Sequence, residues 1–208
     1  HTTMKKSIIL IAAMFMTSVM TFAQKVIRVS TDKTDLVMKV SPKGRLYQVY
    51  LGDKFLNPAD YDNLKWDVYA ASDGAVCQRG HEVYATSGAE DYFEPAVAVT
   101  HADGNMTTYL YYQSSEQKAV EGGTETVITL KDKVYPLTVK LHYVAYAKEN
   151  VIKAWSEISH KEKAPITLWR YSSTMLYFKS SKYYLTNYHS DWAKEGQPET
   201  TQLSTGKK

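Results

Sequence analysis

The chain has 208 residues, of which 44% are hydrophobic and 23% charged, and its formal net charge is +3. This length and composition indicate one globular domain with a sizeable core and exclude a disordered chain. The near-balanced charge gives no reason to expect nucleic acid or an anionic membrane surface as a partner.

The N-terminal residues predict a secretory signal peptide over residues 4–23, preceded by three leader residues. Met4 is followed by two lysines, and Ile8–Met20 is a mostly apolar stretch that is short for a bilayer span. Small residues end the segment, so we expect cleavage before Gln24 and a secreted or periplasmic protein with no membrane attachment. The alternative, a retained anchor, would need a longer apolar run.

The cysteine and histidine content predicts neither a disulfide nor a metal site. Cys77 is the only cysteine, which excludes an intramolecular disulfide, and no neighbouring base supports a nucleophilic role, so we expect an inert thiol. No pair among histidines 81, 101, 142, 160 and 189 has the spacing of a zinc site. We expect no cofactor, and we expect His142 to be solvated.

The first third of the chain predicts three strands and then a long irregular segment. Strands are expected at Val26–Ser30, Leu36–Val40 and Leu46–Leu51, and the Pro-Lys-Gly turn at residues 42–44 makes the last two a hairpin. From Gly52 to Gly88 no periodic pattern persists. Long loops inside compact domains are usually functional.

The remainder of the chain predicts further antiparallel strands. A turn at Asp103-Gly104-Asn105 is expected to join two strands as a hairpin, and residues 148–150 another two. In the strand from residue 137 to 146, apolar residues alternate with Thr138, Lys140 and His142. The expected strands are Ala96–Thr100, Thr107–Gln113, Thr124–Lys131, Leu137–Tyr146, Ile152–Ile158, Ile166–Phe178 and Lys182–Tyr188.

These elements favour an all-β fold. The chain has 17 tyrosines and 5 phenylalanines, and tyrosine, threonine and valine favour half-buried pleated surfaces. No window outside the signal segment shows a helical stripe of apolar residues. Many strands with turns at short spacing predict a sandwich of two antiparallel sheets.

The polar C-terminal stretch from Tyr188 onward contains one large aromatic, Trp192, beside Asp191 and Glu195. An exposed indole next to carboxylates suits sugar binding, because a pyranose face stacks on the ring while the carboxylates accept from hydroxyls. The alternative is a tryptophan that folds back onto a sheet as a loop anchor, and tryptophans are mostly packed.

Two motifs, Trp-Ala-x-Glu at Trp192 with Leu-Ser-x-Gly-x-Lys after it, and the stretch Glu82–Ala96, resemble sequences of glycoside hydrolase family 36, the α-galactosidases. The Trp-Ala-x-Glu sequence at Trp192, followed by Leu-Ser-x-Gly-x-Lys from Leu203, is similar to the end of that family's N-terminal domain. The stretch Glu82–Ala96 is similar to its Glu-Tyr-Pro-x-Tyr-Gly-x-x-Asp-Phe-Arg-x-Pro-Ala, although Tyr84 replaces the proline and Tyr-Phe replaces Phe-Arg. The resemblance extends from about Leu36 to Lys208.

The resemblance implies that residues 24–208 form a galactose-mutarotase-like supersandwich followed by a catalytic barrel. It implies the non-catalytic N-terminal domain of a retaining α-galactosidase that acts on terminal α-galactosides as a homo-oligomer. In the family, loops of this domain reach a neighbouring subunit's active site. By that resemblance Trp192 contacts sugar, and so does Asp60 or, as second choice, Asp62.

No catalytic residue is expected in this chain. Lys65-Trp66-Asp67 matches the tripeptide that contains the family's nucleophile, but it lies in a loop-rich region without βα units and Asp67 has no second carboxyl partner. We interpret the match as coincidence. The alternative function is a freestanding secreted carbohydrate-binding β-sandwich that shares only the fold.

Overall fold

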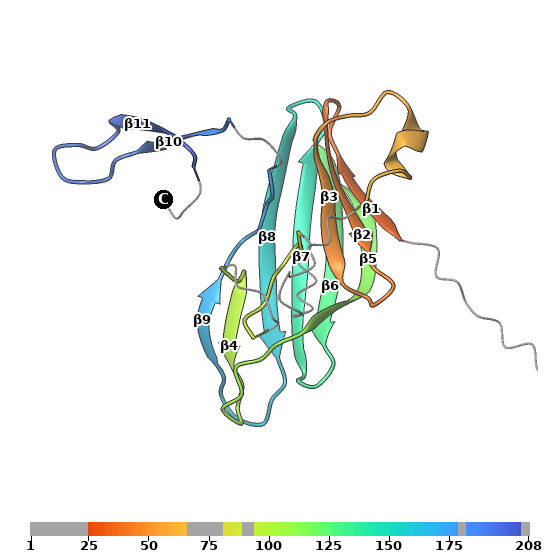
Figure 1. Cartoon of the computed structure of the whole chain (residues 1–208), viewed down its shortest axis with the longest axis vertical. Helices are drawn as coiled ribbons and strands as arrows, with labels where there is room; N and C mark the ends of the chain where they lie inside the picture. The colour runs from red at the N-terminus through yellow and green to blue at the C-terminus, as the bar shows by residue number, and fades with distance from the viewer. Residues whose placement is uncertain (1–24, 66–80, 89–93, 179–181, 205–208) are drawn as a thin grey trace, which may run out of the picture.

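The computed structural model describes residues 25–65, 81–88, 94–178 and 182–204 (Figure 1). In these ranges every regular element is a β-strand except the four-residue 3₁₀ turn η1, Pro58–Tyr61. The expected signal peptide and Cys77 lie outside them. None of the described residues forms a helix long and apolar enough to cross a membrane.

The first sheet has three antiparallel strands in the order β1-β2-β3. These are β1 (Val26–Ser30), β2 (Thr34–Val40) and β3 (Leu46–Asp53), so the expected hairpin is confirmed. The turn between β2 and β3 places Gly44 at φ 81°, in the left-handed region that glycine tolerates.

The second sheet has four antiparallel strands in the order β5-β6-β7-β8. Its members are β5 (Leu110–Val120), β6 (Gly123–Asp132), β7 (Leu137–Tyr146) and β8 (Val151–His160). Every odd-numbered residue of β7 from Leu137 to Ala145 is buried, which confirms the predicted apolar face. Val151 pairs with Tyr146, so the expected β7–β8 hairpin is also confirmed.

The core lies between the two sheets. One cluster of buried residues draws Ile27 and Met38 from the first sheet, Ile128 and Leu141 from the second, and Val97 from the short strand β4. The fold is therefore the antiparallel β-sandwich that the sequence predicted. A second, smaller cluster covers the outer face of the first sheet, where Val37, Val49 and Tyr61 are buried together.

The predicted hairpin across the Asp103-Gly104-Asn105 turn is wrong. The turn itself forms, since the Gly104 amide donates to the His101 carbonyl at 2.9 Å. However, β4 (Val97–Thr100) pairs with β9 (Thr167–Tyr171), and β5 begins only at Leu110 and pairs with β6. The Tyr109 amide donates to the Asp132 carboxylate at 2.6 Å, which directs the chain to β6 instead.

The expected long strand Ile166–Phe178 is also wrong, because β9 ends at Tyr171. Beyond it, the Ser172 carbonyl accepts hydrogen bonds from the Tyr84 and Ser156 hydroxyls at 2.7 and 2.8 Å, which turns the backbone toward the core. A strand that the sequence did not predict, β11 (Pro198–Gln202), pairs with β10 (Tyr184–Tyr188).

Residues 182–204, which we call the C-terminal arm, project from the sandwich in Figure 1. Among the described residues, β10 and β11 make extensive contact only with each other. All of β10 and most of β11 are exposed. The arm is thus a two-stranded hairpin without a sheet to support it.

Candidate functional site

The turn that carries Asp60 and Asp62 follows β3 and contains η1. The Asn57 side chain accepts a hydrogen bond from the Ala59 amide at 3.1 Å, and Pro58 at the first position of the turn has a fixed φ. These two residues therefore determine where the 3₁₀ turn begins. Both aspartates are exposed, whereas Tyr61 between them is buried. Both carboxylates are therefore free to meet a ligand from outside the chain.

The same turn is fixed to β2 by a buried lysine. The Lys39 ammonium donates to the carbonyls of Asp62 at 3.1 Å and Leu64 at 2.6 Å, and the residue is only 1% exposed. Burial lowers the pKa of Lys39 below its usual value, and the nearby Asp62 charge opposes this only in part. The Tyr61 hydroxyl donates to the buried Asp35 carboxylate.

Trp192 lies in the loop between β10 and β11 and is 91% exposed. Its loop is a defined turn, in which the Lys194 amide donates to the Asp191 carbonyl at 2.9 Å and Gly196 takes a φ of 74°. The anchor interpretation of Trp192 is therefore wrong for the contacts within this chain. Its indole face is available to an external partner.

The structure does not bring Trp192 together with Asp60 and Asp62. In Figure 1, η1 and the C-terminal arm lie on opposite sides of the sandwich. A small sugar bound to one copy of this chain cannot touch both.

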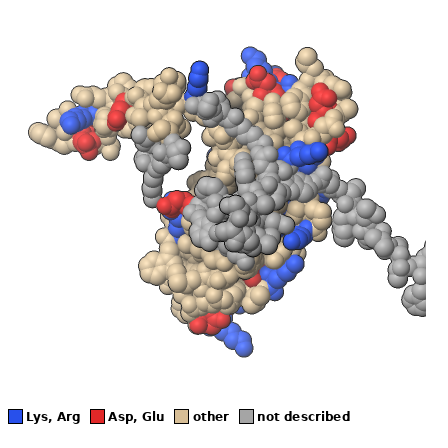
Figure 2. Space-filling view, viewed as in Figure 1, with Lys and Arg blue, Asp and Glu red and all other residues tan. Residues whose placement is uncertain are grey.

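Many of the exposed large apolar side chains belong to the C-terminal part of the chain. Figure 2 shows a mostly uncharged surface over the arm. On the arm and on β9 the exposed large apolar residues are Leu168, Trp169, Tyr171, Tyr184, Leu185, Tyr188, Trp192 and Leu203. Exposed aromatics such as those on the arm are typical of surfaces that meet another protein.

The described part of the Glu82–Ala96 motif is structural. Glu82 accepts two hydrogen bonds from the Arg45 guanidinium, both at 2.8 Å, and the residues from 83 to 86 are buried. Tyr84, at the position where the family has proline, donates to the Ser172 carbonyl. Residues 89–93 of the motif lie outside the described residues, as do Trp66 and Asp67.

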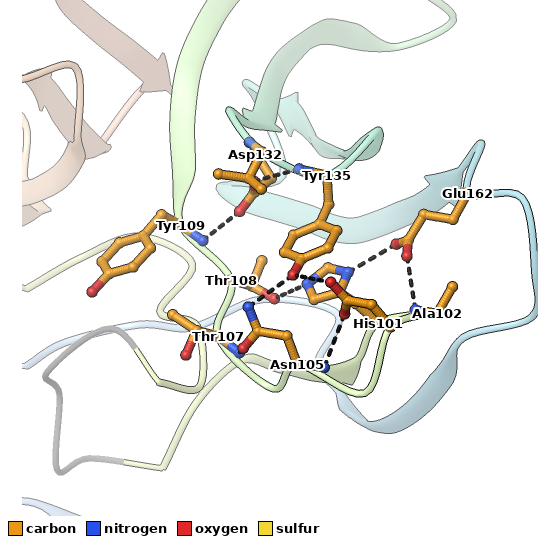
Figure 3. Close-up of polar contacts among 11 residues, drawn as sticks. His101, Ala102, Asn105, Thr107, Thr108, Tyr109, Asp132, Tyr135 and Glu162 are labelled. Carbon is orange, nitrogen blue, oxygen red and sulfur yellow. Dashed lines mark hydrogen bonds and ion pairs between the residues drawn. The ribbon is translucent and has the colours of Figure 1, made fainter.

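A buried polar cluster, which the sequence did not predict, surrounds His101 (Figure 3). Its Nδ1 lies 2.8 Å from the Glu162 carboxylate and its Nε2 lies 2.9 Å from the Thr108 hydroxyl, while its ring stacks on Tyr135. Burial works to raise the pKa of Glu162, but the hydrogen bonds from His101 and the Ala102 amide hold it below its usual value. The cluster ties the β4–β5 connection to the segment after β8.

A hydroxyl, an imidazole and a carboxylate in this order also form the catalytic triads of hydrolases, but here the hydroxyl is not accessible to a substrate. Thr108 is 0% exposed, so no substrate could approach its hydroxyl. The geometry therefore supports a structural role. The cluster fixes the β4–β5 connection, the β6–β7 connection that carries Tyr135, and the segment after β8 to one another. No group of three or more histidine, cysteine, aspartate or glutamate side chains in the described ranges could hold a metal ion.

The expectation that His142 is solvated is wrong. Its Nδ1 lies 2.8 Å from the Glu125 carboxylate, and its ring stacks on Trp155 with centroids 4.6 Å apart. The hydrogen bond from His142, followed by that from Lys118, lowers the pKa of Glu125. Cross-strand neighbours thus cover a histidine that alternation assigned to solvent.

A family model described as the glycosyl hydrolase family 36 N-terminal domain matches residues 44–208 of the chain. A comparison with curated proteins found no match.

Solved structures share the fold. The α-galactosidase from Lactobacillus brevis is 21% identical with a TM-score of 0.74, and the alignment covers 89% of this chain and 28% of that one. A variant of the family 36 α-galactosidase AgaA from Geobacillus stearothermophilus in complex with raffinose is 22% identical, with a TM-score of 0.74 and coverage of 88% and 28%. An AgaA variant in complex with stachyose is 21% identical, with the same TM-score and coverage. The chain thus spans 28% of the length of these structures.

Proposed function

Since the chain belongs to the glycosyl hydrolase family 36 N-terminal domain family, we propose that it is the non-catalytic N-terminal domain of a longer α-galactosidase. In this proposal the whole enzyme hydrolyses terminal α-D-galactosyl residues of galacto-oligosaccharides, and this domain contributes to oligomer assembly and to the rim of the sugar site. The leader at residues 4–23 supports export to the periplasm or beyond.

Two observations support a non-catalytic role for this domain: the positions of its carboxylates, and its length relative to the α-galactosidases of known structure. A retaining glycosidase needs two carboxyl groups about 5–5.5 Å apart on a rigid frame. The buried carboxylates of Glu125 and Glu162 each pair with a histidine, and the exposed Asp60 and Asp62 lie on a short turn. These placements support assigning bond cleavage to a part of the longer enzyme other than this domain. Raffinose and stachyose, bound to the AgaA variants, support galacto-oligosaccharides as the proposed substrate class.

The exposure of Trp192 on the C-terminal arm is the observation that carries the proposal. An isolated two-stranded hairpin is marginally stable in water, so the arm needs a surface to lie on. Its exposed aromatic residues suit the rest of the enzyme or a second copy of it. Docking there would bring the indole of Trp192 to the edge of a sugar site.

The turn with Asp60 and Asp62 supplies a second contact of different chemistry, since its carboxylates can accept from sugar hydroxyls. Because the turn and the C-terminal arm, which carries Trp192, lie on opposite sides of the domain (Figure 1), they serve different sugar sites, or one site from two copies. A homo-oligomer provides both arrangements, and this supports assembly as part of the function.

The test is steady-state kinetics of the full-length enzyme on an aryl α-galactoside. We expect Trp192→Ala to weaken substrate binding by about 1–3 kcal/mol through KM. Asp60→Asn should raise KM while Asp62→Asn should not, and the isolated chain should not cleave the substrate. An unchanged KM for Trp192→Ala would remove the sugar-rim role. Calorimetric binding of galactosides to the isolated chain would instead favour the freestanding carbohydrate-binding module.

A further inference from the structure

Lys39 is a lysine in a fully buried position, where charged side chains are rarely found. It lies in β2, between the buried Met38 and the strand's last residue, and the whole side chain is enclosed. Enclosing an ammonium group is costly unless it finds hydrogen-bond partners. The described partners of this ammonium are two backbone carbonyls, those of Asp62 and Leu64, and both belong to the turn that carries the candidate sugar contacts.

The turn has weak hydrogen bonds of its own. Its backbone contacts measure 3.1 Å from the Asp60 amide to Asn57, 3.2 Å from Asp62 to Ala59, and 3.3 Å from Asn63 to Asp60 and from Leu64 to Tyr61. Bonds of this length in a four-residue 3₁₀ turn hold little by themselves. The position of the turn on the sheet therefore depends on what attaches it.

Two attachments bracket the aspartates. Lys39 donates to the backbone carbonyls at the C-terminal end of the turn. Tyr61 is buried against Val37 and Val49, and its hydroxyl donates to the Asp35 carboxylate. The Arg28 guanidinium also lies over the Tyr61 ring, 4.6 Å from its centroid. Asp60 and Asp62 are thus the exposed residues immediately on either side of a buried anchor.

We propose that Lys39 is a positioning residue for the carboxylates of this turn, with Tyr61 as the second anchor. The inference rests on the proposed function, because it assigns Lys39 a role in sugar binding through Asp60. A carboxylate selects a sugar hydroxyl only when it is held close to the productive position. Lys39 provides this hold through the backbone carbonyls of Asp62 and Leu64, without itself touching the sugar.

The first measurement is amide hydrogen exchange on the full-length enzyme. Lys39→Met keeps the length of the side chain and removes both hydrogen bonds, so exchange at Asp62, Asn63 and Leu64 should accelerate while the strands of the sandwich keep their protection. Lys140→Met, a change at an exposed lysine of β7, is the matched control and should leave the turn unaffected.

The second measurement is kinetic. A turn that is correctly placed for only a third to a tenth of the time raises the apparent dissociation constant by about 3- to 10-fold, so Lys39→Met should raise KM by that factor with kcat unchanged. In the Asp60→Asn background the same substitution should have almost no further effect, because the two changes act through one contact. Tyr61→Phe should show the same pattern, and it replaces Lys39→Met if that variant does not fold.

The outcomes separate the two proposals. If neither Asp60→Asn nor Asp62→Asn changes KM, the sugar role of the turn is wrong and the positioning role is wrong with it. If Asp60→Asn raises KM but Lys39→Met and Tyr61→Phe do not, only the positioning role is overturned. Additive effects of Lys39→Met and Asp60→Asn would also overturn it, since they would indicate a general structural loss.

Discussion

His101 and Glu162 are hydrogen-bonded, with 2.8 Å between Nδ1 and Oε1, and their side chains are only 0% and 5% exposed. They are separated by sixty-one positions in the sequence. The pair joins the end of β4 to the segment after β8, and Thr108 and Tyr135 complete the cluster. The lower end of the sandwich in Figure 1 is thus fixed by buried polar contacts as well as by the apolar core.

Acid should destabilise the domain through Glu162. A carboxyl whose pKa is lower in the folded state contributes stability above its unfolded value, and this is lost as pH falls through the folded value. Because the pKa of Glu162 is lowered, we expect part of the stability to disappear below about pH 4.5. Glu162→Gln should cost about 1.5–3 kcal/mol at pH 7 and flatten the acid limb in urea titrations. Glu149→Gln, in the exposed β7–β8 turn, should change neither.

Tyr84→Phe should destabilise the domain although it keeps the ring. The substitution removes the hydroxyl that donates to the Ser172 carbonyl and contacts Ser156, with an expected cost of about 1–3 kcal/mol in the free energy of unfolding. Chemical denaturation measures it. An effect below about 0.5 kcal/mol would mean that water replaces the hydroxyl without loss. Tyr171→Phe, at an exposed position of β9, is the control.

Trp192→Ala should leave the stability of the isolated chain unchanged within about 0.5 kcal/mol, because the indole is exposed. Tyr143→Ala, which empties a core position, should cost about 3–5 kcal/mol. Thermal melts of the two variants compare them directly. A large loss for Trp192→Ala would show that the arm folds back onto the sandwich in solution.

Gly123→Ala should destabilise the β6–β7 pair. A Cβ at Gly123 would clash with the Ala145 carbonyl oxygen, and backbone atoms cannot move aside without breaking strand pairing. We expect a loss of about 1–3 kcal/mol. At Gly104 a Cβ would meet nothing within 4 Å, so Gly104→Ala should cost only the strain of its φ of 87°, about 1 kcal/mol. Equal losses at both positions would contradict the steric argument.

Local pattern was sufficient for much of the fold. Alternation in β7 predicted which side chains enter the core, and turn residues predicted the β2–β3 and β7–β8 hairpins. The pairing of β4 with β9 could not be predicted, because it joins segments about seventy residues apart and nothing local encodes it. β11 was missed since its sequence, Pro-Glu-Thr-Thr-Gln, buries almost nothing and pairs through backbone alone.

The candidate site was predictable only as residue types. The family resemblance pointed to Trp192 and to Asp60 or, as second choice, Asp62 as sugar contacts, and this stays a prediction. The structure shows that all three are exposed, and their separation in space depends on the whole fold. The buried Lys39 carried one available signal, a lysine inside the otherwise apolar run of β2. His101 and Glu162 carried none, because each resembles an ordinary surface residue until the chain brings them together.

The projection of the C-terminal arm has a consequence for how this protein folds. Residues that contact mainly one another form their own cooperative unit, with a free energy of opening separate from that of the sandwich. We expect trypsin to cut the isolated chain at the exposed Lys194 long before the sandwich unfolds. We therefore expect the sandwich to fold independently of the arm, and in the proposed assembly the docking of the arm would be a separate, later step.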